Sequence, residues 1–267
     1  MLYEGVIRKM ESELGNPIQY YLDFPNDVVN VNQLIGKNIQ IRFDRYCCLN
    51  CELEKKVYRS GYCYGCFFKL PQVAEWVIRP ELSQAHLGIE DRDLEYEKAM
   101  QLQPHIVYLA NSSSVKVGVT RKSQVPTRWI DQGAHEAIEI LELPNRYLAG
   151  VAEVALKDYV SDKTNWRTML RNEIDDEDLE EWRDKLKEHL PEEVLEYLIS
   201  ENKETHMHFP VELYPTKIKS LNLEKTPFYE GKLMGVKGQY FIFEDGTVFN
   251  VRSHEGFVIQ LQVLLSE

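Results

Sequence analysis

The stretch from His105 to Arg167 carries closely spaced structural signals, and these restrict the fold more than any other part of the sequence. Residues 106–110 and 115–119 are short apolar runs rich in β-branched side chains, and the polar turn cluster at 111–114 separates them. Two such runs around a polar turn predict a β-hairpin, so the stretch begins with two paired strands.

The signals that follow predict a helix, a strand and a longer helix. Pro126 suits the start of a short helix at 125–132, and Gly133 suits its end. Residues 137–143 alternate apolar and acidic side chains, as a half-buried strand does. Asn145 is a suitable N-cap for a helix that continues to about Ser161 with its apolar side chains on one stripe. We therefore predict an α+β core in which residues 105–166 form an antiparallel sheet of at least three strands, flanked by two helices.

This order resembles the core of the GIY-YIG nuclease superfamily, and some motif residues agree. The run IVYL at 106–109 stands where the family has its Gly-Ile-Tyr strand, and KVGVT at 116–120 stands where it has Tyr-Ile-Gly. In one alignment Val107 and Lys116 replace the two motif tyrosines, and a shift by one residue recovers only Tyr108. Lysine replaces the second tyrosine in some branches of the superfamily. The resemblance implies a GIY-YIG-like domain over about 104–170.

The resemblance also implies roles for single residues. Arg128 occupies the first helix as the family's catalytic arginine does, Glu153 resembles its metal-binding glutamate, and Asn165 follows at a fitting distance. Hydrolysis of a phosphodiester needs a divalent ion, a cation on the phosphate and a base that activates water. Glu153 would hold Mg²⁺ or Mn²⁺, Arg128 would bind the phosphate, and Tyr108 or Lys116 would be the base. Alternatively, Glu153 is a solvated helix residue and Arg128 is a surface partner for Asp131.

The five cysteines lie close together, and four of them form two Cys-x2-Cys pairs. Cys48 and Cys51 precede Cys63 and Cys66 by a spacer of 11 residues. Two such pairs can present four thiolates to a structural Zn²⁺ in tetrahedral geometry, whereas a thioredoxin-like redox pair would need a βαβ context. Cys47 is left over, and a shift of register would let it replace Cys48. This cysteine usage predicts a reducing compartment and hence a cytoplasmic location.

The net charge of −12 is concentrated in one segment. Residues 171–204 contain 14 acidic and 5 basic residues, so this segment carries −9 and the rest of the chain only −3. The pattern predicts two amphipathic acidic helices, at 175–186 and 191–199. Solvated helices packed by one face are the simple interpretation, and the alternatives are a nucleic-acid mimic or a docking site for a basic protein partner.

Both ends of the chain are rich in strand-like runs. These runs are residues 2–9, 18–24, 38–43, 228–235, 239–243, 247–251 and 257–264. The sequences LYEGVIRKM and FYEGKLMGV resemble each other, and Asp245-Gly246 is a strong hairpin turn. We therefore expect the two ends to pack together as one β module, with the middle of the chain inserted between them.

These observations divide the chain into six segments. They are an N-terminal β segment (1–46), a four-cysteine zinc hairpin (47–70), a linker with short helices (71–103), the α/β core (104–170), the acidic helices (171–205) and a C-terminal β segment (206–267). The cysteine hairpin, the core and the run KTPFYEGKLMGVKGQYFIF together resemble a bacterial family of unknown function. That second resemblance implies no activity.

Three functional hypotheses remain open at this point. The first is a zinc-binding protein that acts on DNA or RNA as a metal-dependent nuclease or phosphodiesterase. The second is an inactive nucleic-acid-binding scaffold, in which the hairpin interleaves basic and aromatic residues. These are Lys55, Lys56, Tyr58, Arg59 and Tyr62. The third is a protein-interaction module led by the acidic helices. No apolar run reaches the roughly 18–20 residues of a membrane span, so we expect no membrane association.

Overall fold

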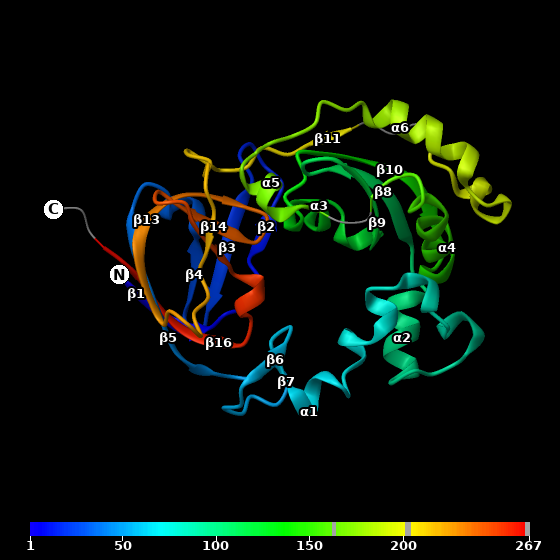
Figure 1. The fold of residues 1–267 in the computed structure, drawn as a ribbon. Coiled ribbons are helices and arrows are strands. Elements are labelled where there is room, and N and C mark those ends of the chain that lie inside the picture. Colours follow the sequence, from blue (N-terminus) through cyan, green and yellow to red (C-terminus); the bar gives the residue numbers. More distant parts are fainter. Residues whose placement is uncertain (162–163, 201–203, 265–267) are drawn as a thin grey trace. The chain divides into compact units, whose positions relative to one another are not determined.

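The computed structural model describes residues 1–161, 164–200 and 204–264. The chain forms two compact units. The first unit consists of Met1–Phe68, Leu170–Asn172 and Met207–Glu267, and the second consists of Lys69–Met169 and Glu173–His206. The middle of the chain is thus inserted into a unit built from both ends (Figure 1).

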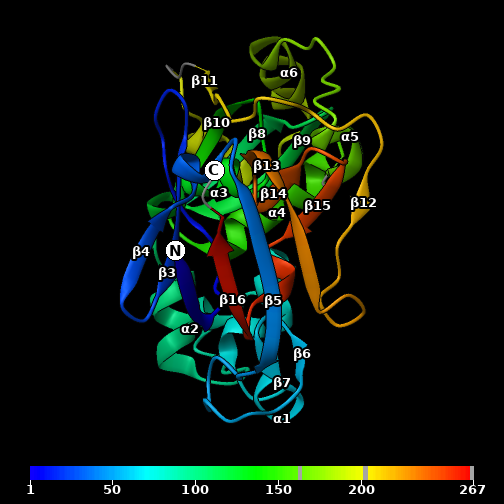
Figure 2. The same ribbon diagram turned by 90° about the vertical axis from the view of Figure 1, so that its left-hand side faces the viewer.

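The first unit is built around a sheet of seven strands in the order β1-β16-β5-β13-β14-β15-β12. The C-terminal strand β16 (Phe257–Val263) pairs with β1 (Leu2–Val6) on one side and β5 (Asn38–Tyr46) on the other, both antiparallel (Figure 2). Next to β5 lies β13 (Phe228–Lys237). The sheet is completed by β14 (Tyr240–Phe243), β15 (Thr247–Asn250) and β12 (Lys219–Ser220). Strands from both ends therefore share one sheet, which confirms the expected β module.

The turn between β14 and β15 shows why this part of the sequence was predictable. Gly246 has φ of +81°, and a Cβ there would lie 2.3 Å from the carbonyl oxygen of Lys217. Only glycine combines a positive φ with such a close backbone approach at little cost. Asp245 accepts a hydrogen bond from the backbone N–H of Thr247 at 2.9 Å, which closes the turn.

Two smaller sheets complete the first unit. Strands β2 (Glu11–Glu13), β3 (Gln19–Phe24) and β4 (Asp27–Asn30) form an antiparallel meander. Strands β6 (Val57–Arg59) and β7 (Tyr62–Cys63) pair in the cysteine hairpin and lead into the short helix α1 (Tyr64–Phe67).

The second unit contains a sheet of four strands in the order β11-β10-β8-β9. Strand β8 (His105–Asn111) lies between β9 (Val115–Arg121) and β10 (Glu136–Leu143), and both pairings are antiparallel. Strand β11 (Thr205–His206) adds a short edge to β10. With α3 (Thr127–Asp131) and α4 (Arg146–Leu156), the predicted order strand, strand, helix, strand, helix is present.

Both helices of this core are shorter than predicted. Helix α3 begins only after Pro126, whose φ of −90° and ψ of 4° place it at the N-cap rather than inside the helix. Asn145 does cap α4, because its side chain accepts a hydrogen bond from the N–H of Leu148 at 2.9 Å. The helix ends at Leu156, and Ser161 instead accepts a backbone hydrogen bond from Val117 of β9 at 2.9 Å.

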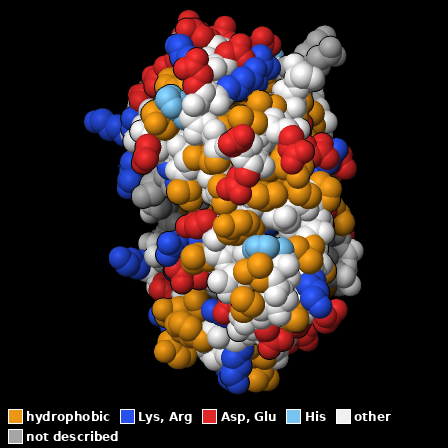
Figure 3. All heavy atoms as spheres, turned by 90° about the vertical axis from the view of Figure 1, so that its right-hand side faces the viewer, with side chains coloured by type: hydrophobic (Ala, Val, Ile, Leu, Met, Phe, Trp, Pro, Cys, Tyr) orange, Lys and Arg blue, Asp and Glu red, His pale blue; other side chains and the backbone are white. Residues whose placement is uncertain are grey.

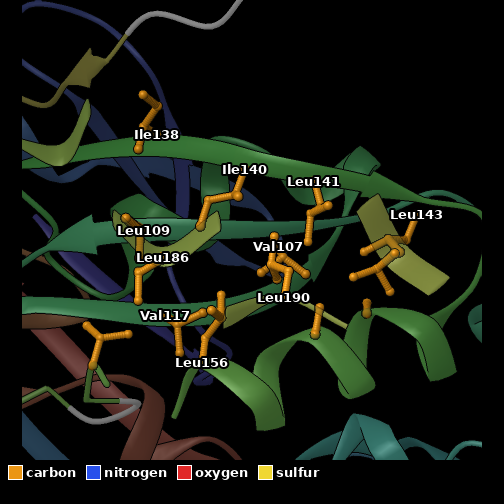
Figure 4. Close-up of a cluster of buried hydrophobic side chains, with 14 of the residues drawn as sticks. Val107, Leu109, Val117, Ile138, Ile140, Leu141, Leu143, Leu156, Leu186 and Leu190 are labelled. Atoms are coloured by element: carbon orange, nitrogen blue, oxygen red, sulfur yellow. The ribbon is translucent and has the colours of Figure 1, made fainter. Parts of the chain in front are cut away.

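Apolar side chains of the sheet, of α4 and of the acidic segment form the core of the second unit (Figure 4). Every residue of β8 is buried, because side chains pack on both faces of this central strand. The fully buried members of the cluster include Val107, Leu109, Ile138, Ile140, Leu141, Leu143, Ala149, Ala152, Leu156, Leu179 and Val194.

The remaining segments of the second unit are short helices and turns. In the linker segment, helix α2 (Leu94–Gln101) is preceded by 3₁₀ helices at Pro71–Val73, Glu75–Val77, Pro80–Leu82 and Ala85–Leu87. Helix α5 (Trp166–Leu170) follows Asn165, and α6 (Leu179–Leu186) follows Asp178. The second acidic helix, predicted at 191–199, is a 3₁₀ helix at Glu192–Tyr197. None of the helices in the described ranges is long and apolar enough to cross a membrane.

Candidate functional site

The four cysteines of the two Cys-x2-Cys pairs lie together in the first unit. The sulfur atoms of Cys48, Cys51, Cys63 and Cys66 all lie within 4.8 Å of one another, and those of Cys51 and Cys63 are 4.0 Å apart. A tetrahedron of thiolates with Zn–S distances of ~2.3 Å has edges of roughly 3.8 Å. The cluster therefore has the ligand type, number and spacing that a structural zinc site needs.

The acidity of these thiols also suits a cation. Burial raises the pKa of Cys48, but backbone N–H groups of Cys51, Cys63 and Asn50 outweigh it and lower that pKa to about 6. A hydrogen bond from Asn50 lowers the pKa of Cys66, whereas burial and hydrogen bonds with the other three cysteines raise it to about 11. One thiolate thus forms readily, and four adjacent thiolates need a bound cation to offset their repulsion.

Backbone contacts anchor the cysteine hairpin to the β module. The N–H of Cys47 donates to the carbonyl oxygen of Gly256 at 2.7 Å, and the N–H of Leu49 donates to that of Gly61 at 2.9 Å. Gly256 has φ of +81°, and a Cβ there would lie 2.7 Å from Val57 and 2.8 Å from the Gly61 oxygen. Cys47 lies outside the group of four, so its backbone holds the hairpin while its thiol faces the Glu52 carbonyl at 3.6 Å.

A second group of chemically capable side chains lies in the second unit, around Tyr108. This tyrosine is fully buried on β8, and its hydroxyl donates to Gln132 Oε1 at 3.1 Å. Burial raises the pKa of Tyr108, while the charge of Arg128 and hydrogen bonds with Gln132 and Arg128 oppose that rise, and the charge of Glu153 adds to it. Tyr108 therefore stays protonated at neutral pH and interacts with Arg128 and Glu153.

Lys116 of β9 is the second member of this group. It is only 3% exposed, and its Nζ donates to Thr164 Oγ1, which in turn lies 3.2 Å from Ser112 Oγ. Burial lowers the pKa of Lys116 to about 7, and the nearby charge of Arg128 contributes to the decrease. A substantial fraction of this amine is therefore neutral at physiological pH, unlike that of an ordinary lysine.

Glu153 on α4 is the acidic member of the group. It is 8% exposed, and its Oε2 lies 3.3 Å from Nζ of Lys157 one turn later. Its charge also acts on Arg146, whose pKa is lowered to about 10 by burial, raised by Glu153 and lowered by Arg128. We name Tyr108, Lys116, Arg128 and Glu153 the buried polar cluster. These four predicted site residues come from four different elements and act on one another electrostatically.

Glu153 belongs to no group of three metal-ligating side chains within the described ranges. A single carboxylate still fits Mg²⁺ or Mn²⁺ at a phosphate site. Mg²⁺ keeps several waters and is commonly held by one or two carboxylates together with the phosphate of the substrate. The residues present therefore fit a divalent ion that arrives with its substrate.

Three residues that interact with the buried polar cluster were not foreseen from the sequence, namely Gln132, Arg146 and Thr164. Arg146 donates to the carbonyl oxygens of Trp76 and Val77 at 3.1 and 2.6 Å and thus attaches the start of α4 to the linker segment. No local pattern marks such a residue, because its partners lie about 70 residues away in the chain. Asn165 is placed differently from the expectation: its Oδ1 accepts hydrogen bonds from the N–H groups of Arg167 and Thr168, so it caps α5.

The acidic segment packs through one face and exposes its charges. Leu179, Leu186 and Val194 are buried in the core, as the apolar stripes predicted. Its exposed charges are interspersed, and α6 carries a Glu181–Lys185 ion pair at 2.8 Å. Figure 3 shows the same mixture of acidic and basic side chains at the end that carries α6. The geometry supports the simple interpretation of solvated helices.

The comparisons with known proteins identify a family and no individual relative. Residues 36–259 match the model of a protein family whose description is "Protein of unknown function (DUF2797)". The match includes the four clustered cysteines and the whole buried polar cluster. No curated protein and no solved structure matches the chain.

Proposed function

We propose that this chain, which belongs to the family of unknown function DUF2797, is a zinc-binding protein that hydrolyses phosphodiester bonds of nucleic acid with the help of a divalent ion. The observation that carries the proposal is the buried polar cluster, in which a tyrosine, a lysine, an arginine and a glutamate from separate elements influence one another electrostatically. The resemblance of this stretch to the GIY-YIG nucleases points to the same four residues.

Lys116 is the better candidate for the general base. A base that activates water works best when its pKa lies near the working pH, and burial brings that of Lys116 to about 7. The pKa of Tyr108 is raised, so its hydroxyl remains a hydrogen-bond donor. In this assignment neutral Lys116 accepts a proton from the attacking water, and Tyr108 positions the groups around it.

Arg128 is the candidate phosphate ligand. It is only partly buried, whereas Tyr108, Lys116 and Glu153 are buried, so it is the member of the cluster most accessible to substrate. A guanidinium can donate two parallel hydrogen bonds to phosphate and stabilise the charge that develops during transfer. Glu153 would hold the divalent ion, which when bound polarises the phosphoryl oxygen and stabilises the leaving oxygen.

Metal-dependent cleavage of labelled DNA and RNA tests this proposal. With Mg²⁺ or Mn²⁺ the wild-type protein should cleave, and Glu153→Gln should abolish cleavage while nucleic-acid binding persists. Lys116→Met should reduce the rate by roughly 10²- to 10⁴-fold, the usual contribution of a general base. Arg128→Gln should weaken both cleavage and binding, since it removes a phosphate contact and a stabilising charge.

Matched controls exist in the same unit. Lys122 and Glu142 form an exposed ion pair at 2.7 Å outside the cluster. Lys122→Met and Glu142→Gln repeat the same chemical changes and should leave cleavage close to the wild-type rate. Cleavage that survives Glu153→Gln and Lys116→Met would rule out this cluster as the active site.

The second candidate function is a nucleic-acid-binding scaffold without catalysis, and the deep burial of the cluster favours it. Buried polar groups that satisfy one another also serve to specify a core. For such a protein no divalent ion produces cleavage, and binding weakens steeply as salt concentration rises. The same cleavage and binding assays therefore separate the two candidates.

A further inference from the structure

A pocket of about 540 Å³ lies in the first unit, beside the cysteine hairpin. One wall consists of β6 and the turn after it, residues 57–60, and the other walls come from residues 220–224 and 250–257. Ligand pockets in proteins typically measure ~300–1,000 Å³, so this one is large enough for a nucleotide. Residues of the cysteine hairpin and of the C-terminal strands thus enclose the same space.

Two arginines and two glutamates line this pocket. Arg59 and Arg252 both line it. Each of its two carboxylates accepts a hydrogen bond from a residue that does not line the pocket. Glu224 accepts a hydrogen bond from the Tyr46 hydroxyl at 2.8 Å and lies 3.4 Å from Lys56 Nζ, and Glu255 accepts one from the N–H of Lys9 at 3.0 Å. A guanidinium can donate two parallel hydrogen bonds to a phosphate, so these two arginines are the phosphate-binding side chains that the pocket offers.

Most of the polar groups deeper in the pocket stabilise its own walls. His254 is buried, its Nδ1 lies 2.7 Å from the carbonyl oxygen of Asn250, and its Nε2 accepts from the N–H of Leu223 at 3.2 Å. Asn222 Oδ1 accepts from the N–H of Glu224 at 2.8 Å. These bonds hold the wall that carries Arg252 in a defined shape, so the pocket is largely preformed.

An aromatic cluster continues from the pocket along the hairpin. Tyr58 lines the pocket and also contacts Tyr64, Phe67 and Phe68, with ring centroids 5.2, 5.2 and 5.7 Å apart. Tyr58 and Tyr64 are 53% and 65% exposed, which is unusual for rings that already contact one another. Exposed aromatic rings near basic side chains can stack unpaired bases.

We infer that this pocket binds a phosphate-bearing nucleotide unit, with Arg59 and Arg252 on the phosphate and the aromatic cluster against the base. The inference deepens the proposed function and rests on it, because it supplies a contact for single-stranded nucleic acid outside the buried polar cluster. Since β6 belongs to the cysteine hairpin, zinc loading positions Arg59 and Tyr58, and binding at the pocket depends on the metal.

Fluorescence anisotropy with a short, labelled, 5′-phosphorylated oligothymidine tests the inference without added Mg²⁺ or Mn²⁺. Arg59→Gln and Arg252→Gln should each weaken binding roughly 10-fold, as expected for a lost hydrogen bond to a charged group. Each change should also reduce the slope of log affinity against log salt by about 1. Tyr58→Leu should weaken binding by a similar factor, because it removes a stacking surface.

The control is Arg45→Gln, which removes an exposed arginine of the same unit that pairs with Asp44 and does not line the pocket. It should leave affinity within roughly 2-fold of wild type, in line with the small effects of exposed ion pairs. Equal zinc content and equal thermal unfolding of all variants show that the hairpin is intact. Removal of zinc by a chelator should abolish binding, and readdition should restore it.

Competition by thymidine 5′-monophosphate distinguishes a site for free nucleotides from a site for nucleic-acid strands. Displacement of the strand by the mononucleotide at comparable concentration indicates a site for free nucleotides, and displacement only by longer strands indicates a nucleic-acid site. Wild-type affinity in both Arg59→Gln and Arg252→Gln, or no wild-type binding at low salt, overturns the inference. Because this assay contains no Mg²⁺ or Mn²⁺, its failure is independent of whether the protein cleaves nucleic acid.

Discussion

Gly118 of β9 lies directly opposite Tyr108 of β8, and a Cβ at position 118 would lie 2.6 Å from the Tyr108 hydroxyl oxygen. The tyrosine ring thus occupies the space above the glycine, with its hydroxyl hydrogen-bonded to Gln132. This arrangement fixes the position of Tyr108 in the buried polar cluster, because any larger residue at 118 must displace the ring.

The first prediction therefore concerns Gly118→Ala. The added methyl group should destabilise the protein by ~1–3 kcal/mol, the usual cost of overpacking, and should lower cleavage by moving Tyr108. Urea unfolding and the cleavage assay measure the two effects. Gly65→Ala is the control, because a Cβ at position 65 meets no atom within 4 Å. Equal stability of Gly118→Ala and wild type would contradict the contact.

The second prediction is a pH dependence that arises from Lys116. In the proposed mechanism its neutral form is the base, so the cleavage rate should rise as pH increases through about 7 and then level off. Lys116→Arg should lose this rise, because arginine stays protonated. The measurement is the pH profile of the single-turnover rate, and a flat wild-type profile would exclude Lys116 as the base.

Lys116 should also make stability depend on pH, independently of catalysis. Its pKa is lowered from 10.5 in the ordinary state to about 7 in the folded protein. Between these values the unfolded chain binds more protons than the folded one, so this residue makes the free energy of unfolding increase with pH across that window. Below a pH of about 7 the lysine is charged in both states, so the full cost of burying its charge lowers the free energy of unfolding. Comparing wild type with Lys116→Met across the window isolates this contribution from those of other groups.

The third prediction concerns the four clustered cysteines. Protein purified without a metal-binding tag should contain one zinc ion per chain, held by Cys48, Cys51, Cys63 and Cys66. Apparent zinc binding free energies of ~10–16 kcal/mol exceed what a short hairpin gains from packing, so chelation should unfold residues 47–66. Elemental analysis and hydrogen exchange measure these outcomes. Cys47→Ser should retain zinc, whereas Cys63→Ser should lose it.

The fourth prediction concerns the packing of α4, the helix that carries Glu153. A Cβ at Gly150 would lie 2.2 Å from the backbone nitrogen of Glu81, so the helix lies directly against the 3₁₀ helix at Pro80–Leu82. Gly150→Ala should destabilise the protein by at least ~1–3 kcal/mol, because backbone atoms cannot move aside as a side chain can. Val154→Ala, at an exposed position of the same helix, should change stability by less than ~0.5 kcal/mol.

Several features of this protein depended on local sequence alone and were predictable for that reason. The Asp245-Gly246 turn, the Asn145 cap and the spacing of the cysteine pairs each involve residues within a few positions of one another. Alternating or stripe-like apolar patterns likewise placed most strands of both units within a few residues. In each case the interactions that decide the conformation lie inside the segment itself.

The tertiary structure decided those features in which the interacting residues lie far apart in the chain. Helix α4 ends at Leu156 because the chain after it pairs with β9, and nothing in the helix pattern records that pairing. The sequence left Tyr108 and Lys116 as equal candidates for the base, and burial separates them by moving their pKa values in opposite directions. The burial of a side chain depends on packing by many elements, so a sequence motif does not reveal it.

The two candidate sites show the same division. Four cysteine ligands were assigned from spacing alone, since two short knuckles form locally and need only meet. The pocket beside them combines β6 with residues from beyond position 219, which become neighbours only when the C-terminal strands join the N-terminal sheet. Local chemistry determined the cysteine cluster that could hold a metal ion, and the long-range pairing of the two chain ends decided what surrounds it.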